Sequence, residues 1–444
     1  MSTLVSQGSQ FTAEYLYALG WADRLFESLA PAAMHMRPIE FRHPCIFYYG
    51  HLPAFTWNQI FRFVLGKPSL NAYFDTLFER GIDPADDSMP ESRIGNWPPV
   101  EHVSDYKQRV QTELFGLLST EQEKIERNAD LRRALNMVLE HYWMHVETFI
   151  YMMHQLPLEL KRPIVLAEER RLPAGESGLA RAGAIKIPAG MVTLGAERDQ
   201  VQFGWDNEFD SMLVHVETFA LDKMPVTNGE FLEFVENGGY TNEQLWTADG
   251  WMWINSFERQ HPQFWTKEDG KWLELGLFEV KEFNENHPAW VSLVEARAFA
   301  KWKNARLMTE PEFQRAAYGS DDGSEVAYPW GDNEPQPVHG NFGLRLLDAA
   351  PVGTNPHGAS RFGIEELVGN GWEWTQTAFA PLPGFSSFPS YPGYSADFFD
   401  GRHYVLKGAS PVTPCRLLRR SFRNWFQPHY PYMFAKFRCA YGVS

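Results

Sequence analysis

Cysteine is scarce in this chain: only Cys45, Cys415 and Cys439 occur among 444 residues. Three scattered cysteines exclude a disulfide framework and suit a reducing cytosol. Basic residues are also in deficit, with 40 Lys and Arg against 56 Asp and Glu, which gives a formal net charge of −16. A chain this acidic is a poor candidate for holding nucleic acid or an anionic membrane by bulk charge.

Long apolar runs are absent as well. No stretch of the sequence approaches the roughly 20 continuous apolar residues of a membrane-spanning helix. The opening residues lack the basic and apolar regions of a signal peptide. We therefore expect a cytoplasmic protein that acts on small molecules, with neither nucleic acid nor a membrane as a partner.

The composition that is present is globular, with 44% hydrophobic and 22% charged residues, and the length suits about two domains. Aromatic residues make up 15% of the chain and include 16 Trp. Such a density indicates either a loop-rich domain braced by large side chains or a site that holds a cation on aromatic faces. Bracing is the commoner use.

Helical periodicity dominates the first part of the chain. Apolar residues recur in steps of three and four and their multiples from Leu131 to Met152, in a long segment that ends near Pro157. Thr120, with Glu123 in capping-box spacing, is the predicted start of that segment. Further helices are expected over about 12–30, 52–65 and 101–118. Four helices with Pro-rich connections favour an up-and-down bundle.

A different pattern begins near residue 185. Short β-like runs alternate with Gly, Pro, Asn and Asp, and only two helices are clear, near 227–237 and 292–303. The second follows Ser292 in a capping box. The predicted organisation is an all-α bundle over 1–160, a linker over 161–184 and an α+β, loop-rich domain over 185–444.

The sharpest local chemistry is a pair of histidines on the long helix. His141 and His145 are four residues apart, so both lie on one face, one turn apart, where a single ion can reach them. Glu147 falls about 200° around the helix and should not share that ion. His51, at the start of another helix and among apolar neighbours, is the best candidate for a third ligand. Histidines at this spacing are also found packed in cores, so the spacing alone does not distinguish a metal site from core packing. Three histidines suit zinc with an activated water or ferrous iron that binds oxygen, and the spacing does not choose between them.

Longer motifs carry a resemblance to known families. The segments FYYGH and HYWMHVE resemble a DinB-type bundle. The segments IPAGMVTLGA, FGWDNE, YPWGD, LVGNGWEWT and RNW resemble the formylglycine-generating-enzyme/sulfatase-modifying domain, whose fold is C-type-lectin-like. This order of motifs is similar to that of the non-haem iron sulfoxide synthases of ergothioneine and ovothiol biosynthesis.

The resemblance implies a reaction and a metal site. Such enzymes use Fe(II) and O2 to join a cysteine-type thiol to the imidazole ring of a histidine derivative such as hercynine, and they oxidise the sulfur to a sulfoxide. The positions that match the iron ligands are His51, His141 and His145. Three neutral ligands leave three octahedral positions, enough for a thiolate, an imidazole and O2.

Substrate contacts are implied residue by residue. Asn424 matches the family's polar contact to the histidine derivative, and Trp425 and Phe426 are placed to face a trimethylammonium group. Such a group cannot donate hydrogen bonds, but aromatic faces attract it. Met144 stands where many bacterial members carry a Gln that touches the imidazole. For the carboxylate of the thiol, Arg93 matches a family position.

Other arginines are alternatives for that carboxylate, namely Arg420 and Arg423. The family's proposed proton donor is a tyrosine where this chain has Leu382, so Tyr73, Tyr391 and Tyr394 are the replacement candidates.

Phe426 also replaces an acid found in members that use γ-glutamylcysteine, which favours free cysteine as the thiol here. Three alternatives to a hercynine-using synthase stay open: the same chemistry on histidine, as in a 5-histidylcysteine sulfoxide synthase of the ovothiol type; a thiol dioxygenase; and a non-catalytic ligand-binding homologue. Formylglycine generation is not expected, because Cys415 and Cys439 do not form that family's close cysteine pair.

Overall fold

A computed structural model describes residues 7–79, 97–165 and 183–443 of the chain. The chain forms two compact units, Met1–Val165 and Leu166–Ser444. The predicted linker overlaps residues 166–182, which lie outside the described residues, as does Arg93.

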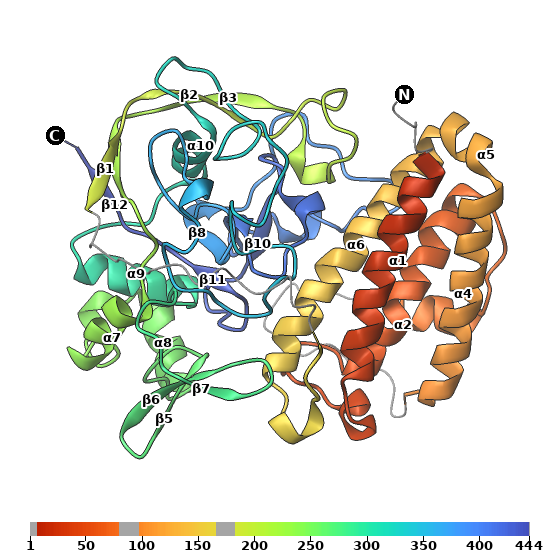
Figure 1. Ribbon diagram of the computed structural model, residues 1–444, viewed down its shortest axis with the longest axis horizontal. Coiled ribbons are helices and arrows are strands. Elements are labelled where there is room, and N and C mark those ends of the chain that lie inside the picture. The colour runs from red at the N-terminus through yellow and green to blue at the C-terminus, as the bar shows by residue number, and fades with distance from the viewer. Residues whose placement is uncertain (1–6, 80–96, 166–182, 444) are drawn as a thin grey trace. The chain divides into compact units, whose positions relative to one another are not determined.

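In its described residues, the first unit is a bundle of four long helices (Figure 1). These are α1 (Gln7–Glu27), α2 (Cys45–Thr56), α4 (Val100–Thr120) and α6 (Ala129–His154). Both α1 and α2 pack against α4 and α6. Shorter helices connect them: η1 (Pro31–His35), η2 (Trp57–Val64), α3 (Ala72–Leu77), α5 (Gln122–Arg127) and η3 (Leu158–Leu160). The four-helix bundle expected from the sequence is confirmed.

The start of the long helix differs from the prediction. Asn128 caps α6, and its side chain accepts the backbone N–H of Leu131 at 3.0 Å. Thr120 instead ends α4, because its hydroxyl donates to the carbonyl of Gly116 at 2.8 Å and is not available to cap a following helix. The short helix α5 fills the interval.

Helix α2 is almost entirely buried. All of its residues except Tyr49 are buried, as is typical of a helix that is apolar all round. It continues directly into the π-helical segment η2, a geometry often found near functional sites.

Over residues 183–443, the second unit is built from small sheets and four α-helices (Figure 1). The strands are β1 (Ala184–Ile187), β2 (Gly190–Leu194), β3 (Met212–Val216), β4 (Phe219–Asp222), β5 (Trp265–Glu268), β6 (Lys271–Leu275), β7 (Val280–Glu282), β8 (Gly371–Ala378), β9 (Tyr404–Ala409), β10 (Asn424–Phe426), β11 (Ala435–Lys436) and β12 (Ala440–Gly442). They form sheets in the orders β1-β4-β12, β10-β9-β8-β11, β2-β3 and β5-β6-β7. Among the described strands, every pairing is antiparallel except that of β11 with β8. This α+β arrangement confirms the predicted fold class.

The α-helices described in this unit are α7 (Asn228–Glu236), α8 (Ala248–Ser256), α9 (Leu293–Trp302) and α10 (Glu310–Tyr318). Short 3₁₀ turns lie in the connections: η5 (Asp206–Glu208), η6 (Glu243–Leu245), η7 (Pro356–Gly358), η8 (Ala396–Phe398) and η9 (Cys415–Leu417). The capping box at Ser292 is confirmed, since its hydroxyl and Glu295 bond each other's backbone N–H groups. Helices α8 and α10 were not among the predicted ones. A capping box of Thr309 and Glu312 starts α10. Its S/T-x-x-E spacing is the sequence pattern from which the start of this helix could have been predicted.

The centre of the second unit holds a charged cluster that is part of its core. Glu373, on β8, accepts from Lys436 at 2.6 Å and from Arg438 at 2.8 Å, and all three side chains are fully buried. Removing one partner would leave a buried charge uncompensated, which is costly. The cluster therefore ties β8 to the C-terminal strands.

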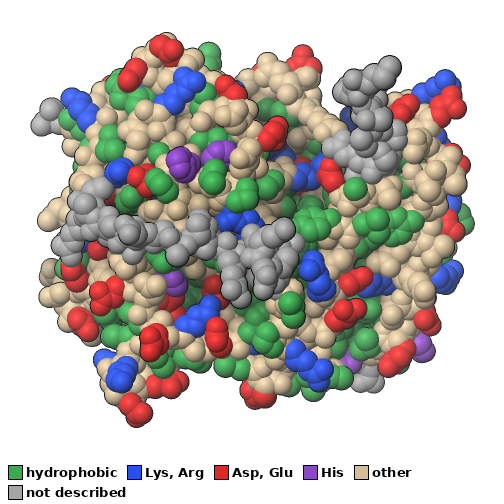
Figure 2. Space-filling view, in the orientation of Figure 1, with side chains coloured by type: hydrophobic (Ala, Val, Ile, Leu, Met, Phe, Trp, Pro, Cys, Tyr) green, Lys and Arg blue, Asp and Glu red, His purple; other side chains and the backbone are tan. Residues whose placement is uncertain are grey.

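The surface carries charges of both signs. Figure 2 shows acidic and basic side chains interspersed over one face of the molecule. Among the described helices, none is long and apolar enough to cross a membrane.

Candidate metal centre and substrate-binding residues

Three histidine side chains converge inside the helical unit. His51 comes from α2, and His141 and His145 come from successive turns of α6. The Nε2 atom of His51 lies 3.2 Å from Nε2 of His141 and 3.2 Å from Nε2 of His145, and the last two are 3.1 Å apart. The structure thus brings together the three residues that the sequence suggested as metal ligands.

This triangle has the dimensions of a ligand set. Ligand nitrogens about 2.1 Å from one ion are separated by about 3.0 Å in octahedral and about 3.4 Å in tetrahedral geometry. The observed separations of 3.1–3.2 Å lie between these values. Among the described residues, these three form the one group of His, Cys, Asp or Glu whose ligand atoms meet the spacing of a metal site. The residues present therefore fit a divalent ion held on one side by three imidazoles.

Electrostatics keep these imidazoles neutral, as a metal ligand must be. Burial lowers the pKa of His51 to about 4, against a smaller opposing effect of its hydrogen bond to the Phe78 carbonyl. Burial, followed by the proximity of the other imidazoles, holds the pKa of His141 well below its ordinary value. Burial likewise lowers the pKa of His145, with His51 and Arg42 adding to the effect.

Aromatic rings hold the imidazole planes in place. Phe55 stacks on His141 with ring centroids 3.6 Å apart, and Phe47 stacks on His51 at 5.3 Å. Tyr48 lies 5.8 Å from His145 in a tilted contact. Since Phe47, Tyr48 and Phe55 all belong to α2, this helix supplies one ligand and orients the rings of the other two.

Met144 lies between the two ligands of α6 in sequence and is half-buried. Its thioether offers no strong hydrogen bond donor or acceptor, so it differs chemically from the Gln of many bacterial members. Tyr73, on α3, is 56% exposed.

In the second unit, strand β10 presents Asn424, Trp425 and Phe426, all half-buried, and pairs with β9. Trp425 stacks flat on Phe379, with centroids 4.3 Å apart and planes within 7°. Phe426 stacks on Tyr430 at 5.1 Å. These two rings of β10 are therefore fixed by other aromatic side chains.

The candidate tyrosines of this unit lie beside that strand. Tyr394 is buried, stacks on Trp205 at 3.9 Å and meets Trp425 edge-on at 5.3 Å. Tyr391 is half-buried and lies 5.5 Å from Tyr394. Of the three candidate tyrosines, Tyr394 therefore contacts Trp425 directly, and Tyr391 contacts Tyr394.

Asp206 anchors the loop that carries Tyr394. The hydroxyl of Ser395 donates to one carboxylate oxygen of Asp206, and the amide of Asn207 donates to Ser395 at 3.1 Å. Burial raises the pKa of Asp206 to about 6, against the opposing effect of hydrogen bonds from the Ser395 hydroxyl and the Asn207 backbone. Asp206 belongs to the FGWDNE segment, so that motif acts here as a support for the tyrosine loop.

Both alternative arginines are engaged within the second unit. Arg423 is buried and forms two contacts with Glu310, at 2.9 and 3.1 Å, and it also lies 4.9 Å from the centre of the Phe379 ring. Arg420 pairs with Glu325 at 3.1 Å. These ion pairs indicate that the two guanidinium groups organise the β10 region.

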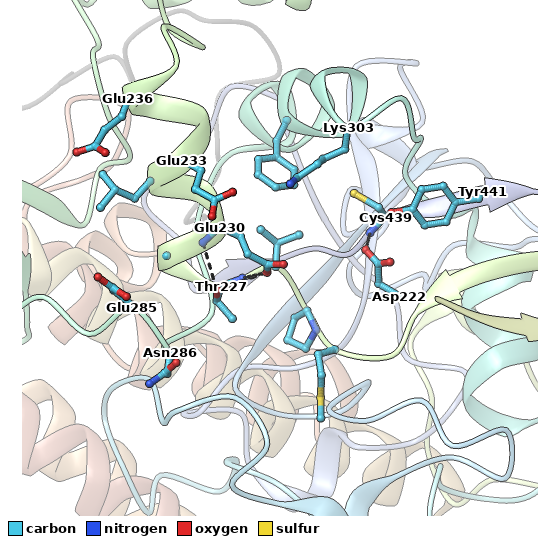
Figure 3. A pocket seen from close by; sticks show the side chains of 16 residues that line it. Asp222, Thr227, Glu230, Glu233, Glu236, Glu285, Asn286, Lys303, Cys439 and Tyr441 are labelled. Carbon is cyan, nitrogen blue, oxygen red and sulfur yellow. Dashed lines mark hydrogen bonds between the residues drawn. The ribbon is translucent and has the colours of Figure 1, made fainter. Parts of the chain in front are cut away.

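A separate polar hollow of about 570 Å³ lies on the second unit (Figure 3). Glu230, Glu233 and Glu236 of α7 line it, opposite Lys303 and Cys439. Glu230 is committed to the helix start, because it accepts the backbone N–H of Thr227 at 3.0 Å.

The cysteines of the second unit remain free thiols. Neither Cys415, which is exposed, nor Cys439, which is buried, forms a disulfide.

Comparison with known proteins identifies both units. Residues 171–443 match the sulfatase-modifying factor enzyme 1-like domain, and residues 22–149 match the DinB superfamily. The chain belongs to the sulfatase-modifying factor enzyme 1-like family. The resemblance inferred from the sequence motifs is confirmed.

Individual relatives are similar to the chain over most of its length. The chain is 37% identical to the hercynine oxygenase of Mycobacterium tuberculosis over 309 residues, which cover 69% of this chain and 71% of that protein. It is 35% identical to the hercynine oxygenase of Mycolicibacterium smegmatis, over 69% of this chain and 71% of that protein. Ergothioneine biosynthesis protein 1 of Neurospora crassa is 29% identical over 89% of this chain, which spans about half (53%) of that longer protein.

Proposed function

We propose that this chain is an Fe(II)- and O2-dependent sulfoxide synthase of ergothioneine biosynthesis, which joins cysteine to the imidazole of hercynine. One thiol, one imidazole C–H and one O2 give one C–S bond, one sulfoxide oxygen and one water. Forming the C–S bond and oxidising the sulfur each release two electrons, and together they reduce O2 completely. The observation that carries the proposal is the triangle of His51, His141 and His145 in a homologue of hercynine oxygenases.

Iron is favoured over zinc for this triangle. Zinc has no redox chemistry, whereas ferrous iron with open positions binds and activates oxygen, which is what an oxygenase requires. Three neutral imidazoles on one side of the ion leave the other side open for substrates. The rings stacked on them would keep the nitrogen lone pairs aimed at one point.

Residues of both units are assigned to the substrates. We assign hercynine to Asn424 and Trp425, because an amide and a fixed indole suit a carboxylate-bearing, trimethylammonium-bearing ligand. The uncharged Phe426 favours cysteine over γ-glutamylcysteine. Arg93, Arg420 and Arg423 stay the candidates for the carboxylate of cysteine, and Met144 for contact with the imidazole.

Tyr394 is the favoured proton donor among the three tyrosines. It is buried and in ring contact with Trp425, whereas Tyr73 is exposed. Substituting Tyr394→Phe should uncouple oxygen uptake from sulfoxide formation, with more oxidised thiol per sulfoxide. Tyr391→Phe is the matched control. If both variants form the same amount of sulfoxide per O2 consumed, Tyr394 is not distinguished from Tyr391 as the proton donor.

The decisive experiment is anaerobic loading with Fe(II), followed by oxygen uptake with hercynine and cysteine, separately and together, and mass analysis of the products. Uptake with a sulfoxide product only when both are present supports the proposal. Equal uptake with cysteine alone indicates a thiol dioxygenase, and a preference for histidine indicates the ovothiol-type reaction. Hercynine binding without any uptake indicates a non-catalytic binding protein.

A further inference from the structure

A hydrogen bond at Nδ1 of His51, the ring nitrogen away from the other two histidines, determines the tautomer of this imidazole. Its Nδ1 atom lies 2.7 Å from the carbonyl oxygen of Phe78, inside the protein. A carbonyl only accepts hydrogen bonds, so Nδ1 must carry the hydrogen. In the neutral ring, Nε2 then keeps its lone pair, and Nε2 is the atom that faces His141 and His145.

Phe78 is itself locked against the helix that carries His51. A Cβ atom added at Gly50 would lie 2.6 Å from three atoms of the Phe78 ring, closer than any real contact. The ring is fully buried and packs against Phe47, Phe74 and Trp97, so it has no free space into which to move. The absence of a side chain at Gly50 is therefore what lets the Phe78 carbonyl reach His51.

Helix α3, which ends at Phe78, is tied to the bundle through Asp75. This carboxylate is 1% exposed and accepts from the Ser69 hydroxyl at 2.5 Å, the Leu70 N–H at 3.0 Å and the Tyr106 hydroxyl at 2.6 Å. Its backbone carbonyl accepts from the side chain of Asn58 at 2.9 Å. These bonds connect α3 to α4, which carries Tyr106, and to η2.

We propose that Phe78, seated by Gly50 and by the Asp75–Tyr106 hydrogen bond, is a positioning residue that sets the metal affinity of the three-histidine centre. It would hold His51 in the Nδ1–H tautomer and fix the rotation of its ring. The inference rests on the proposed function, because it requires that His51 bind the metal. Loss of such a supporting hydrogen bond typically costs 10–100-fold in metal affinity.

Gly50→Ala is the direct test, with Gly20→Ala as its matched control. Both glycines lie within long helices of the same unit, but an added Cβ at Gly20 meets no atom within 4 Å. Alanine favours both helices intrinsically, so a loss of metal binding in Gly50→Ala alone cannot come from helix propensity. We expect Gly50→Ala to bind Co(II) about 10–100-fold more weakly than wild type, as measured by chelator competition. Gly20→Ala should bind Co(II) with the affinity of wild type.

Tyr106→Phe keeps the test decisive if Gly50→Ala does not fold. Its control is Tyr15→Phe, which also removes a buried hydroxyl, one that donates to the Leu135 carbonyl of α6 at 2.7 Å. Tyr106→Phe should weaken Co(II) binding severalfold relative to Tyr15→Phe. In the metal-free protein, ¹⁵N NMR of the histidine rings should show His51 protonated at Nδ1, and this tautomer should lose its dominance in Gly50→Ala.

The outcomes separate the two proposals. If the wild-type chain does not bind Co(II), or if His51→Ala binds it equally well, the metal centre itself is wrong. If binding depends on His51 but Gly50→Ala and Tyr106→Phe both bind like wild type, the centre stands and the positioning role of Phe78 is overturned.

Discussion

Phe55 lies flat against His141, with ring centroids 3.6 Å apart and ring planes within 10° of each other. Phe55 follows His51 by four residues on α2, so one face of this helix carries a ligand and, one turn later, the ring that orients another. The geometry of the histidine triangle thus depends on how closely α2 packs on α6.

Replacing that ring should affect both stability and metal binding. Phe55→Leu keeps an apolar side chain but removes the stacked ring, and we expect a loss of about 1–3 kcal/mol in the free energy of unfolding of the metal-free protein. Urea titration measures it. Phe63→Leu, at a position 58% exposed on η2, is the control and should change little. Equal stability of the two variants would contradict a role for the stack.

Each histidine of the triangle should be necessary for the metal. Since loss of a supporting hydrogen bond alone costs about 10–100-fold, loss of a ligand in His141→Ala should weaken binding by more than about 100-fold. Metal analysis after anaerobic loading and desalting should then fall from about one Fe(II) per chain toward zero. His102→Ala, at an exposed position on α4, should retain full loading. Retained loading in His141→Ala would exclude the triangle as the site.

The raised pKa of Asp206 predicts how the stability of the protein depends on pH. Because its pKa is raised to about 6, the folded state binds more protons than the unfolded state between pH 4 and 6. Its stabilising contribution is therefore complete at low pH and is lost as the pH rises through 6. Asp206→Asn cannot titrate, so its stability relative to wild type should improve by up to about 3 kcal/mol between pH 4 and pH 7.

Ser395→Ala is the companion variant for that measurement. It removes a hydrogen bond that lowers the pKa of Asp206 but keeps the carboxyl group. Its pH dependence should persist and move to higher pH. A pH-independent difference between Asp206→Asn and wild type would show that this carboxyl does not titrate as described.

Trp425 should distinguish a quaternary from a primary ammonium. Trp425→Leu removes the aromatic face and should weaken hercynine binding by about 2–30-fold, the range of a cation–π contact, with a smaller effect on histidine. Trp425→Phe retains a ring and should lie between wild type and Trp425→Leu. Calorimetry of both ligands on all three proteins measures it. Equal losses for hercynine and histidine would show that Trp425 acts only in packing.

Phe426 should influence the choice of thiol. Phe426→Asp introduces the acid found in γ-glutamylcysteine-using relatives, and we expect the ratio of kcat/KM for γ-glutamylcysteine to that for cysteine to rise about tenfold, as one charge-assisted hydrogen bond would produce. Phe426→Asn also disturbs the stack on Tyr430 but adds no charge, so it separates charge from packing. An unchanged ratio in Phe426→Asp would contradict the assignment.

The features that the sequence predicts are those set by residues close together in the chain. The spacing of His141 and His145 fixes their common face on a helix, and the capping box at Ser292 marks a helix start. The role of Phe78 has no signature in the sequence, because it acts through its backbone carbonyl, a group that every residue possesses. The partner of Arg423, Glu310, lies 113 residues away, a distance at which periodicity carries no information.

His51 and His141 lie 90 residues apart along the chain, yet their Nε2 atoms are 3.2 Å apart. An ion bound by both would close a loop of that length, much as a disulfide does, in a chain whose three cysteines are too scattered to supply one. Because unfolding would require release of the ion, the melting temperature of the bundle should rise with the concentration of free metal. Metal supply would then govern not only turnover but how long the protein survives proteolysis.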